Sequence, residues 1–363
     1  MNKGKWRGFP KLNVSKAAGP LSSIGAIIVG LLVGLIILLF ANSSKAFEGF
    51  GMILGGGLQS SKDLGNVLYY ATPIIMTGMS VAFAFRTSLF NIGASGQFMM
   101  GAYGAVLVGV LGTGLGPFQW IVALLAAMVF GALWALLPGL LQAYRNVNIV
   151  ISCIMTNYIG MYLVNWLVKG TVYNQMTNRS IAVAETANIP KMGLNEIFPG
   201  SSANGGIIIA IIIAIVIYIL LNKTTFGYEL RACGFNRYAS RYAGINEKRA
   251  IVMSMLISGA LAGIGGGLLY LAGSGKYIAV EDVLAVEGFT GISVALLGMS
   301  HPIGTLFAGL FIAYMTIGGS YMQLAGFVPE IIDIITAVII YFAAFALILR
   351  SVLKRIRTRK GGD

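Results

Sequence analysis

The chain has 363 residues, of which 57% are hydrophobic and only 10% charged, and its mean hydropathy is +0.83. A soluble domain needs about a quarter of its residues charged to cover its surface, so this composition excludes one. The net charge of +13 does not indicate nucleic-acid binding, because the Lys and Arg residues gather at predicted membrane boundaries and leave no basic domain.

Apolar runs of about 20 residues recur along the chain, and this length crosses roughly 30 Å of hydrocarbon. Backbone polar groups in lipid must be satisfied within each segment, so the runs predict an all-α polytopic membrane protein with about ten transmembrane helices. The eighth run is too short to cross alone and is expected to be tilted or to form a broken pair with the ninth. The predicted spans are Ser22–Ala41, Asn66–Phe85, Ile92–Leu111, Phe118–Leu137, Ile149–Val168, Gly205–Leu221, Ile251–Ala272, Gly288–Met299, Pro302–Gly319 and Pro329–Arg350.

Charge asymmetry orients these spans with both termini in the cytoplasm, since cytoplasmic loops carry an excess of Lys and Arg. A basic segment, residues 1–21, precedes a transmembrane domain of residues 22–350, and a basic tail, residues 351–363, follows it. The cations that share the inner side are Lys3, Lys5, Arg7, Lys11, Lys16, Arg86, Arg145, those of the loop 222–250, Arg350, Lys354, Arg355, Arg357, Arg359 and Lys360.

Two outer loops are long. The loop 169–204 is polar with both signs of charge, and its length is sufficient for a small ordered cap without a core of its own. The segment Asn42–Gly65 is Gly-rich and is expected to dip toward the membrane. Rows of small residues, among them Gly259, Gly263 and Gly267, indicate close helix packing in lipid.

The largest cytoplasmic loop, 222–250, contains a predicted short helix. Asn236 is a good N-cap and Gly244 a good C′ residue, which leaves Arg237–Ala243 as about two turns. Tyr238 and Tyr242 are four residues apart, as are Arg237 and Arg241, so each pair forms a stripe. Seven residues do not hold a helix alone in water, and Tyr and Arg are common interface anchors. The pattern therefore predicts docking to a cytoplasmic partner; the alternative, that the charges only fix topology, leaves the caps and tyrosines unexplained.

Catalytic, metal and nucleotide motifs are missing from the sequence. His301 is the only histidine, so a histidine-based metal site or triad is unavailable. The stretch Tyr270–Tyr277 resembles a phosphate loop but has Tyr at the first glycine position and at the Ser/Thr position. Only Glu287, Glu330 and Asp333 are acidic candidates near membrane depth, too few for a convincing coupling-ion site. No cofactor or catalytic activity is expected in this chain. Cys153 and Cys233 lack CxxC spacing and are expected to be reduced.

Five segments in order resemble successive motifs of bacterial ABC-importer permeases of the simple-sugar, nucleoside and branched-chain amino acid type. They are FNIGASGQFMMGAYGA (Phe90–Ala105), PGLLQAYRNVNIVISCIMTNYI (Pro138–Ile159), FGYELRACGFNRYASRYAGI (Phe226–Ile245), SGALAGIGGGL (Ser258–Leu268) and ALLGMSHPIGT (Ala295–Thr305). The most similar branch is the nucleoside permeases that work with a basic-membrane-protein lipoprotein receptor.

The resemblance implies a core like that of the vitamin B12 importer, with two permeases side by side in the bacterial cell membrane. It implies a separate cytoplasmic ATPase that holds Mg-ATP, an extracytoplasmic solute-binding lipoprotein, and a coupling helix in the loop before the seventh span. The coupling residues would then be Arg237, Tyr238, Arg241, Tyr242 and Gly244. The long amino-terminal extension and outer loop resemble the larger of two paired permeases.

The chain departs from the family pattern at four positions. Ser95 and Ile149 stand where Glu is common, and Cys153 and Thr156 replace commoner residues. Two missing carboxylates near the inner half could alter gating or be supplied by the partner permease.

The leading interpretation is an ABC-importer permease for nucleosides; the alternatives are a simple-sugar permease or, from a different class, a secondary carrier or channel. Buried amides can hydrogen-bond a sugar or base, so Asn91, Gln97, Asn157 and Asn165 are candidates for the solute path. For any one of them, holding helices together by hydrogen bonds is the more common role.

Overall fold

The computed structural model describes residues 14–328, 330–339 and 341–342. The predictions for the first 13 residues of the basic segment and for the tail 351–363 lie outside these residues. So do Pro329, where the last predicted span begins, and the end of that span from residue 343 onward.

Helices dominate the described residues. The long ones are α1 (Val14–Ala41), α3 (Ser61–Phe85), α4 (Ala94–Leu111), α5 (Gln119–Arg145), α6 (Ile149–Thr171), α8 (Gly206–Lys223), α11 (Glu247–Tyr270) and α13 (Pro302–Met322). The short ones are α2 (Ala46–Gly55), α7 (Leu194–Ile197), α9 (Thr225–Phe235), α10 (Arg237–Tyr242) and α12 (Val286–Leu297), with single turns η1 (Gly56–Leu58), η2 (Thr113–Phe118), η3 (Glu185–Ala187) and η4 (Gln323–Ala325). A last helix occupies 330–342, with 340 left out, and β1 (Tyr173–Asn174) pairs antiparallel with β2 (Arg179–Ser180).

Seven of the described helices are long and apolar enough to cross a membrane, which confirms a polytopic helical protein. They are α3, α4, α5 extended by η2, α6, α8, α11 and α13 extended by η4. Helix α12 has 12 residues, so the short eighth element is confirmed. The total of ten crossings stays a prediction. The first helix has a described apolar stretch of only Ile27–Ala41, and the last helix is described only as far as residue 342.

Helices α12 and α13 form the expected broken pair. The turn between them is tight: a Cβ on Gly298 would lie 2.5 Å from the Thr305 nitrogen. The Ser300 amide donates to the Ala295 carbonyl at 2.8 Å, which closes the end of α12. On the other side of α12, Gly291 lies against Thr77 of α3, so the short helix is held by backbone-close contacts.

Glycines bring α4, α5 and α11 into backbone contact. A Cβ on Gly263 would lie 2.3 Å from the Ala127 carbonyl oxygen, and one on Gly101 would lie 2.2 Å from the Gly263 Cα. In the same way, a Cβ on Gly259 would lie 2.4 Å from the Gly131 carbonyl oxygen. The predicted small-residue row of α11 therefore faces neighbouring helices.

The segment Asn42–Gly65 is not a loop, which corrects the expectation. It contains α2 and η1, which pack on α13: Gly56 lies against Gly318, and Gly57 lies against the Tyr314 ring. Helix α3 begins at Ser61, five residues earlier than predicted, because the Ser60 side chain accepts a hydrogen bond from the Asp63 amide and caps it.

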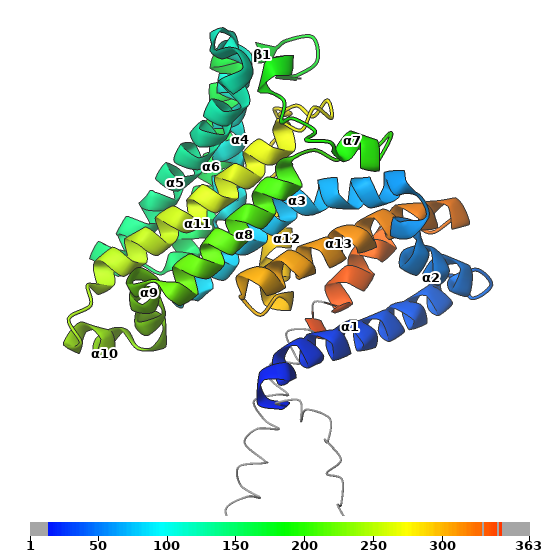
Figure 1. Cartoon of the computed structure of the whole chain (residues 1–363), viewed down its shortest axis with the longest axis horizontal. Coiled ribbons are helices and arrows are strands. Elements are labelled where there is room, and N and C mark those ends of the chain that lie inside the picture. Colours follow the sequence, from blue (N-terminus) through cyan, green and yellow to red (C-terminus); the bar gives the residue numbers. More distant parts are fainter. Residues whose placement is uncertain (1–13, 329, 340, 343–363) are drawn as a thin grey trace, which may run out of the picture.

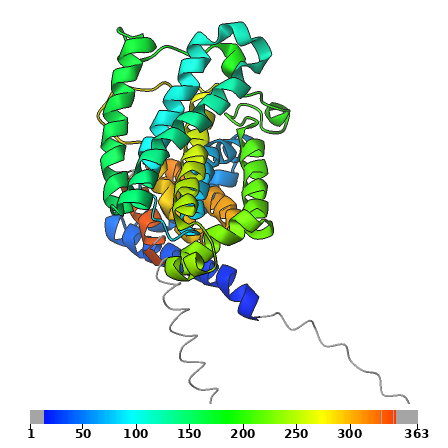
Figure 2. The same ribbon diagram turned by 90° about the vertical axis from the view of Figure 1, so that its left-hand side faces the viewer.

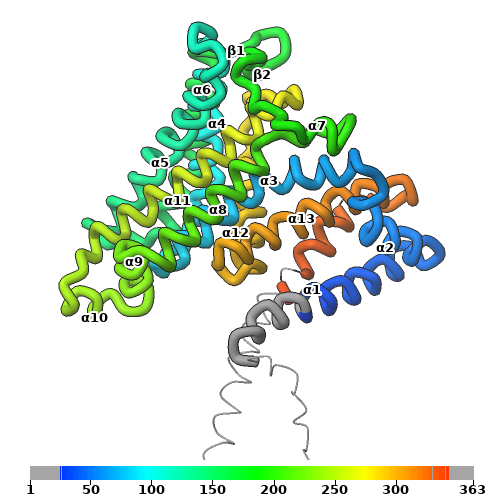
Figure 3. The backbone as a smooth tube through the Cα atoms, viewed as in Figure 1, coloured from blue at the N-terminus to red at the C-terminus, as the bar shows by residue number. Residues whose placement is uncertain are grey.

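The elements form two groups (Figure 1), which meet where α3 packs directly on α13 and α12. Helices α3, α4, α5, α6, α8 and α11 make one group, and α1, α2, α13 and the last helix make the other. Helices α9 and α10 project at one end of the molecule, and β1, β2 and α7 lie at the opposite end (Figure 3). In the view turned by 90°, α6 stands at an edge of the bundle (Figure 2).

Candidate functional site

The loop 222–250 folds into two consecutive helices, of which only the second was predicted. Helix α9 begins after Thr224, whose side chain accepts a hydrogen bond from the Gly227 amide at 3.0 Å. Its apolar residues Phe226, Leu230 and Cys233 recur at helical spacing, and the last two are buried. That cap and spacing are the signal that could have revealed α9 in the sequence.

Helix α10 has the caps that the sequence predicts. The Asn236 side chain accepts a hydrogen bond from the Ala239 amide at 3.0 Å. Gly244 has φ +80°, and the Ile245 amide donates to the Ser240 carbonyl at 3.0 Å, which ends the helix. Both predicted caps are confirmed, and they stabilise a helix of only six residues.

The two tyrosine side chains of α10 face away from the rest of the protein, whereas Ser240 is buried against α9. Tyr238 and Tyr242 are 80% and 94% exposed, and Phe235, just before the helix, is 92% exposed. Arg241 is exposed and Arg237 is half-buried. Protein–protein interfaces are enriched in aromatic residues and arginine, and this projecting end exposes three aromatic side chains and an arginine.

Helix α9 ties this exposed end to the transmembrane bundle. A Cβ on Gly234 would lie 2.2 Å from the Arg86 carbonyl oxygen, in the turn between α3 and α4. In the same turn, Ser88 donates a hydrogen bond to the Gly234 carbonyl, and Thr87 donates one to Ser254 of α11. Burial and the positive charge of Arg231 lower the pKa of Arg86. Helix α9, which carries α10, is therefore in direct contact with this turn.

Three of the four predicted path amides meet in a buried hydrogen-bond network at the start of α4. The Asn91 and Gln97 side chains bond each other at 2.8 and 3.1 Å, and Asn91 also donates to Ser258 at 2.7 Å. The Asn157 side chain accepts from the Gly96 amide and donates to a backbone carbonyl. All three amides are satisfied inside the subunit. This arrangement favours a role in holding α4, α6 and α11 together, and a contact with solute stays a prediction.

Asn165, the fourth amide, lies apart from this network, near the opposite end of α6. Its side-chain nitrogen donates to the Glu281 carbonyl at 2.9 Å and to the Asp282 carboxylate at 3.0 Å. Its side-chain oxygen is buried and has no hydrogen-bond partner among the described residues. Asn165 thus holds the loop 271–285 against α6.

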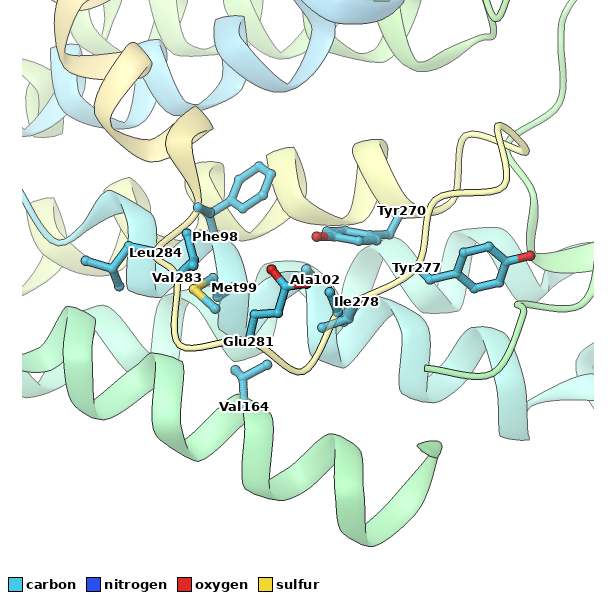
Figure 4. A pocket seen from close by; sticks show the side chains of 12 residues that line it. Phe98, Met99, Ala102, Val164, Tyr270, Tyr277, Ile278, Glu281, Val283 and Leu284 are labelled. Carbon is cyan, nitrogen blue, oxygen red and sulfur yellow. The ribbon is translucent and has the colours of Figure 1, made fainter. Parts of the chain in front are cut away.

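A cavity of about 190 Å³ opens beside this loop (Figure 4). Its walls come from α4, α6, α11 and the loop, and the lining residues are Phe98, Met99, Ala102, Val164, Tyr270, Tyr277, Ile278, Ala279, Glu281, Val283, Leu284 and Ala285. The Glu281 side chain lies among Met99, Ala102 and Tyr270 (Figure 4). The sequence interpretation missed Glu281 and Tyr270. Their signal was a tyrosine at the end of a predicted span and a carboxylate in the predicted loop that follows it.

The segment 169–204, which is predicted to lie on the outer side, packs on the cavity loop. The Arg179 guanidinium lies 4.3 Å from the centroid of the Tyr277 ring. The Ser180 amide donates to the Ile278 carbonyl at 2.9 Å, and the Ser180 hydroxyl accepts a hydrogen bond from the Ile278 amide. The cap and the cavity loop therefore behave as one structural unit.

Residues 64–344 match the family described as branched-chain amino acid transport system / permease component. The chain belongs to this permease family. The guanosine ABC transporter permease protein NupP of Bacillus subtilis is 37% identical over 339 residues, covering 93% of this chain and 96% of the relative. The nucleoside ABC transporter permease protein NupB of Lactococcus lactis is 33% identical and covers 93% and 94%. The glucose ABC transporter permease protein TsgB13 of Haloferax volcanii is 31% identical and covers 93% and 90%. No solved structure matches the chain.

Membership of this family identifies a multi-pass protein of the cell membrane. Both NupP and NupB are named as permease proteins of ABC transporters.

Proposed function

We propose that this chain is the permease subunit of an ATP-driven importer of nucleosides. The observation that carries the proposal is the capped, aromatic α10, which projects from one end of the subunit and is tied through α9 to the α3–α4 turn. The names of NupP and NupB, which match nearly the full length of this chain, support nucleosides as the solute.

Coupling to ATP hydrolysis would run through α10. Tyr238, Tyr242 and Arg241 would anchor in the ATPase, and Arg237 would add positive charge beside them. Gly244 permits the left-handed turn that returns the chain to α11. Motion of α10 would reach the α3–α4 turn through the contact of Gly234 with Arg86. Mg-ATP would bind to the ATPase, and this chain would hold no cofactor.

The exposed face of α6 is the side on which a second permease and the solute path would lie. The exposed residues of α5 and α8 near mid-span are aliphatic, for example Leu133 and Ile215. Helix α6 instead exposes Tyr158 and Tyr162 near its middle, and neither hydroxyl has a partner among the described residues. A hydroxyl left without a partner in hydrocarbon is unfavourable, so this face suits a protein neighbour or a hydrated path.

The outer cavity supports a neutral, hydrogen-bonding solute. The Tyr270 ring offers an aromatic surface against which a base can pack, and the Glu281 carboxylate can accept hydrogen bonds from ribose hydroxyls or base amino groups. A carboxylate also disfavours phosphorylated solutes by charge repulsion. A solute-binding lipoprotein would deliver the nucleoside to this end, where the ordered cap lies.

Import of a simple sugar is the second candidate, because the relative TsgB13 is named as a glucose permease. The same cavity could accept sugar hydroxyls. A secondary carrier or channel has less support, since the exposed α10 would have no role in it.

Uptake by proteoliposomes tests the proposal. The chain is reconstituted with its ATPase, second permease and lipoprotein, and uptake of labelled guanosine, uridine or ribose is followed with ATP and a proton ionophore. We expect ATP-dependent nucleoside uptake that the ionophore does not abolish. Uptake of ribose alone would overturn the solute, and uptake driven by an ion gradient without the ATPase would overturn the importer.

A further inference from the structure

A groove of about 240 Å³ lies between the predicted inner ends of α5 and α11. The two helices are in close contact at Gly139, where a Cβ would lie 3.0 Å from the Met255 Cβ. Toward the ends of the helices, larger side chains replace glycine, and these line the groove. They are Leu140, Tyr144, Asn246, Lys248, Arg249, Val252 and Met253.

The groove carries two unpaired cations. The Lys248 ammonium lies 5.1 Å from the centroid of the Tyr144 ring, which holds it over the groove. Arg249 follows on the next position of α11. Glu247 is the neighbouring acid, and neither cation forms an ion pair with it or with another acid among the described residues. The groove therefore presents positive charge that the subunit itself does not neutralise.

The other end of the groove opens onto the lipid-facing side of α5. This helix is the least buried of the seven membrane-length helices. Its exposed residues Val129, Leu133, Leu137 and Leu140 form an aliphatic stripe that ends at the groove. Tyr144, one turn beyond Leu140, is 62% exposed, at the level where tyrosines favour the membrane–water boundary.

We propose that this groove binds one anionic phospholipid of the cytoplasmic leaflet. The phosphate accepts hydrogen bonds from Lys248 and Arg249, and an acyl chain lies along the aliphatic stripe of α5. Basic pockets between transmembrane helices on the cytoplasmic side suit such headgroups. The proposal does not depend on which solute the permease carries.

Cations at a membrane boundary also fix topology, and that role alone needs no groove. Lys223 at the end of α8 is such a cation: it is exposed, lies on the same predicted side, and is absent from the lining of this groove. It provides a matched control, because Lys223→Gln and Lys248→Gln remove the same charge from the same membrane boundary.

Native mass spectrometry of the purified full-length chain tests the proposal. The protein is exchanged from micelles that contain equal amounts of phosphatidylglycerol and phosphatidylcholine, and the retained lipid is counted. We expect preferential retention of phosphatidylglycerol. Each Lys or Arg near a phosphate contributes about 1 kcal/mol, so Lys248→Gln should lower retention about fivefold. Lys248→Arg and Lys223→Gln should retain it like the parent.

Three results would overturn the proposal. Equal retention by Lys248→Gln and Lys223→Gln would make the charge purely topological. Equal retention of both lipids by the parent would remove the anionic headgroup from the recognition. Displacement of phosphatidylglycerol by millimolar inorganic phosphate would show a site for soluble phosphate instead of lipid. Lys248→Arg guards against misfolding, since it preserves the charge at the same position.

Discussion

Ser88 donates a hydrogen bond of 2.6 Å to the Gly234 carbonyl, and this bond joins the α3–α4 turn to the helix that carries α10. The two residues are 146 positions apart in the chain. Gly234 also lies so close to the Arg86 carbonyl that only a residue without a side chain fits. If α10 transmits motion from an ATPase, this contact is one route by which the motion reaches the membrane domain.

Gly234→Val should therefore uncouple transport. The added side chain must push α9 away from the Arg86 carbonyl, because a Cβ at this position would lie 2.2 Å from that oxygen. We expect normal membrane insertion but loss of most ATP-driven uptake in proteoliposomes. Gly51→Val in α2 is the control, since a Cβ there has no heavy atom within 4 Å. Equal uptake by the two variants would rule out the contact as a coupling element.

Gly263→Leu should disrupt the packing of α11 against α4 and α5. Overpacking of a tight contact commonly costs about 1–3 kcal/mol, and here the leucine Cβ meets backbone atoms of Ala127 and Gly131 in α5. We expect a lower melting temperature of the purified protein and less assembled complex. Gly55→Leu, at an open position of α2, should melt like the parent. A melting temperature unchanged by Gly263→Leu would contradict the packing described for α11.

The sequence was sufficient to predict the elements whose signals are local. Apolar runs revealed the long helices, and Asn236 and Gly244 revealed the two ends of α10. It was insufficient for α2, because that helix is stabilised by glycine contacts with α13, far away in sequence. The cavity around Glu281 was also missed, since it forms only when the loop 271–285 meets α4 and α6. The buried amides were found, but hydrogen-bond partners decide their role, and sequence does not show partners.

Ser95 lies in a tight contact between α4 and α12, which leaves no room for the Glu that the resemblance to the permease family leads us to expect at this position. A Cβ on Gly288 of α12 would lie 2.4 Å from the Ser95 Cα, and the Ser95 hydroxyl donates to the Ala285 carbonyl at 2.8 Å. Ser95→Glu would place a carboxylate in this contact without a cation beside it. We expect lower yield and thermal stability, with Ser95→Ala much milder. A stable, active Ser95→Glu protein would mean that α12 readily moves away.

Glu281→Gln tests the outer cavity as a solute site. The amide keeps the size of the side chain but removes its charge and one acceptor, so fewer hydrogen bonds reach ribose or base. We expect the KM for nucleoside uptake to rise about tenfold, which corresponds to about 1.4 kcal/mol of binding, with a smaller effect on maximal rate. Glu196→Gln, on the outer cap away from the cavity, is the matched control. An unchanged KM in Glu281→Gln would remove this cavity from the solute path.

The central claim, that α10 couples this permease to an ATPase, is tested most directly by Tyr238→Ala combined with Arg241→Ala. Both side chains project from α10 into solvent, so their removal should leave the bundle intact. ATP-driven nucleoside uptake and co-purification of the ATPase are measured together in membranes with matched expression. We predict that the double variant inserts normally, loses the ATPase on purification and no longer accumulates nucleoside. Full uptake with the ATPase still bound would contradict the docking role of α10.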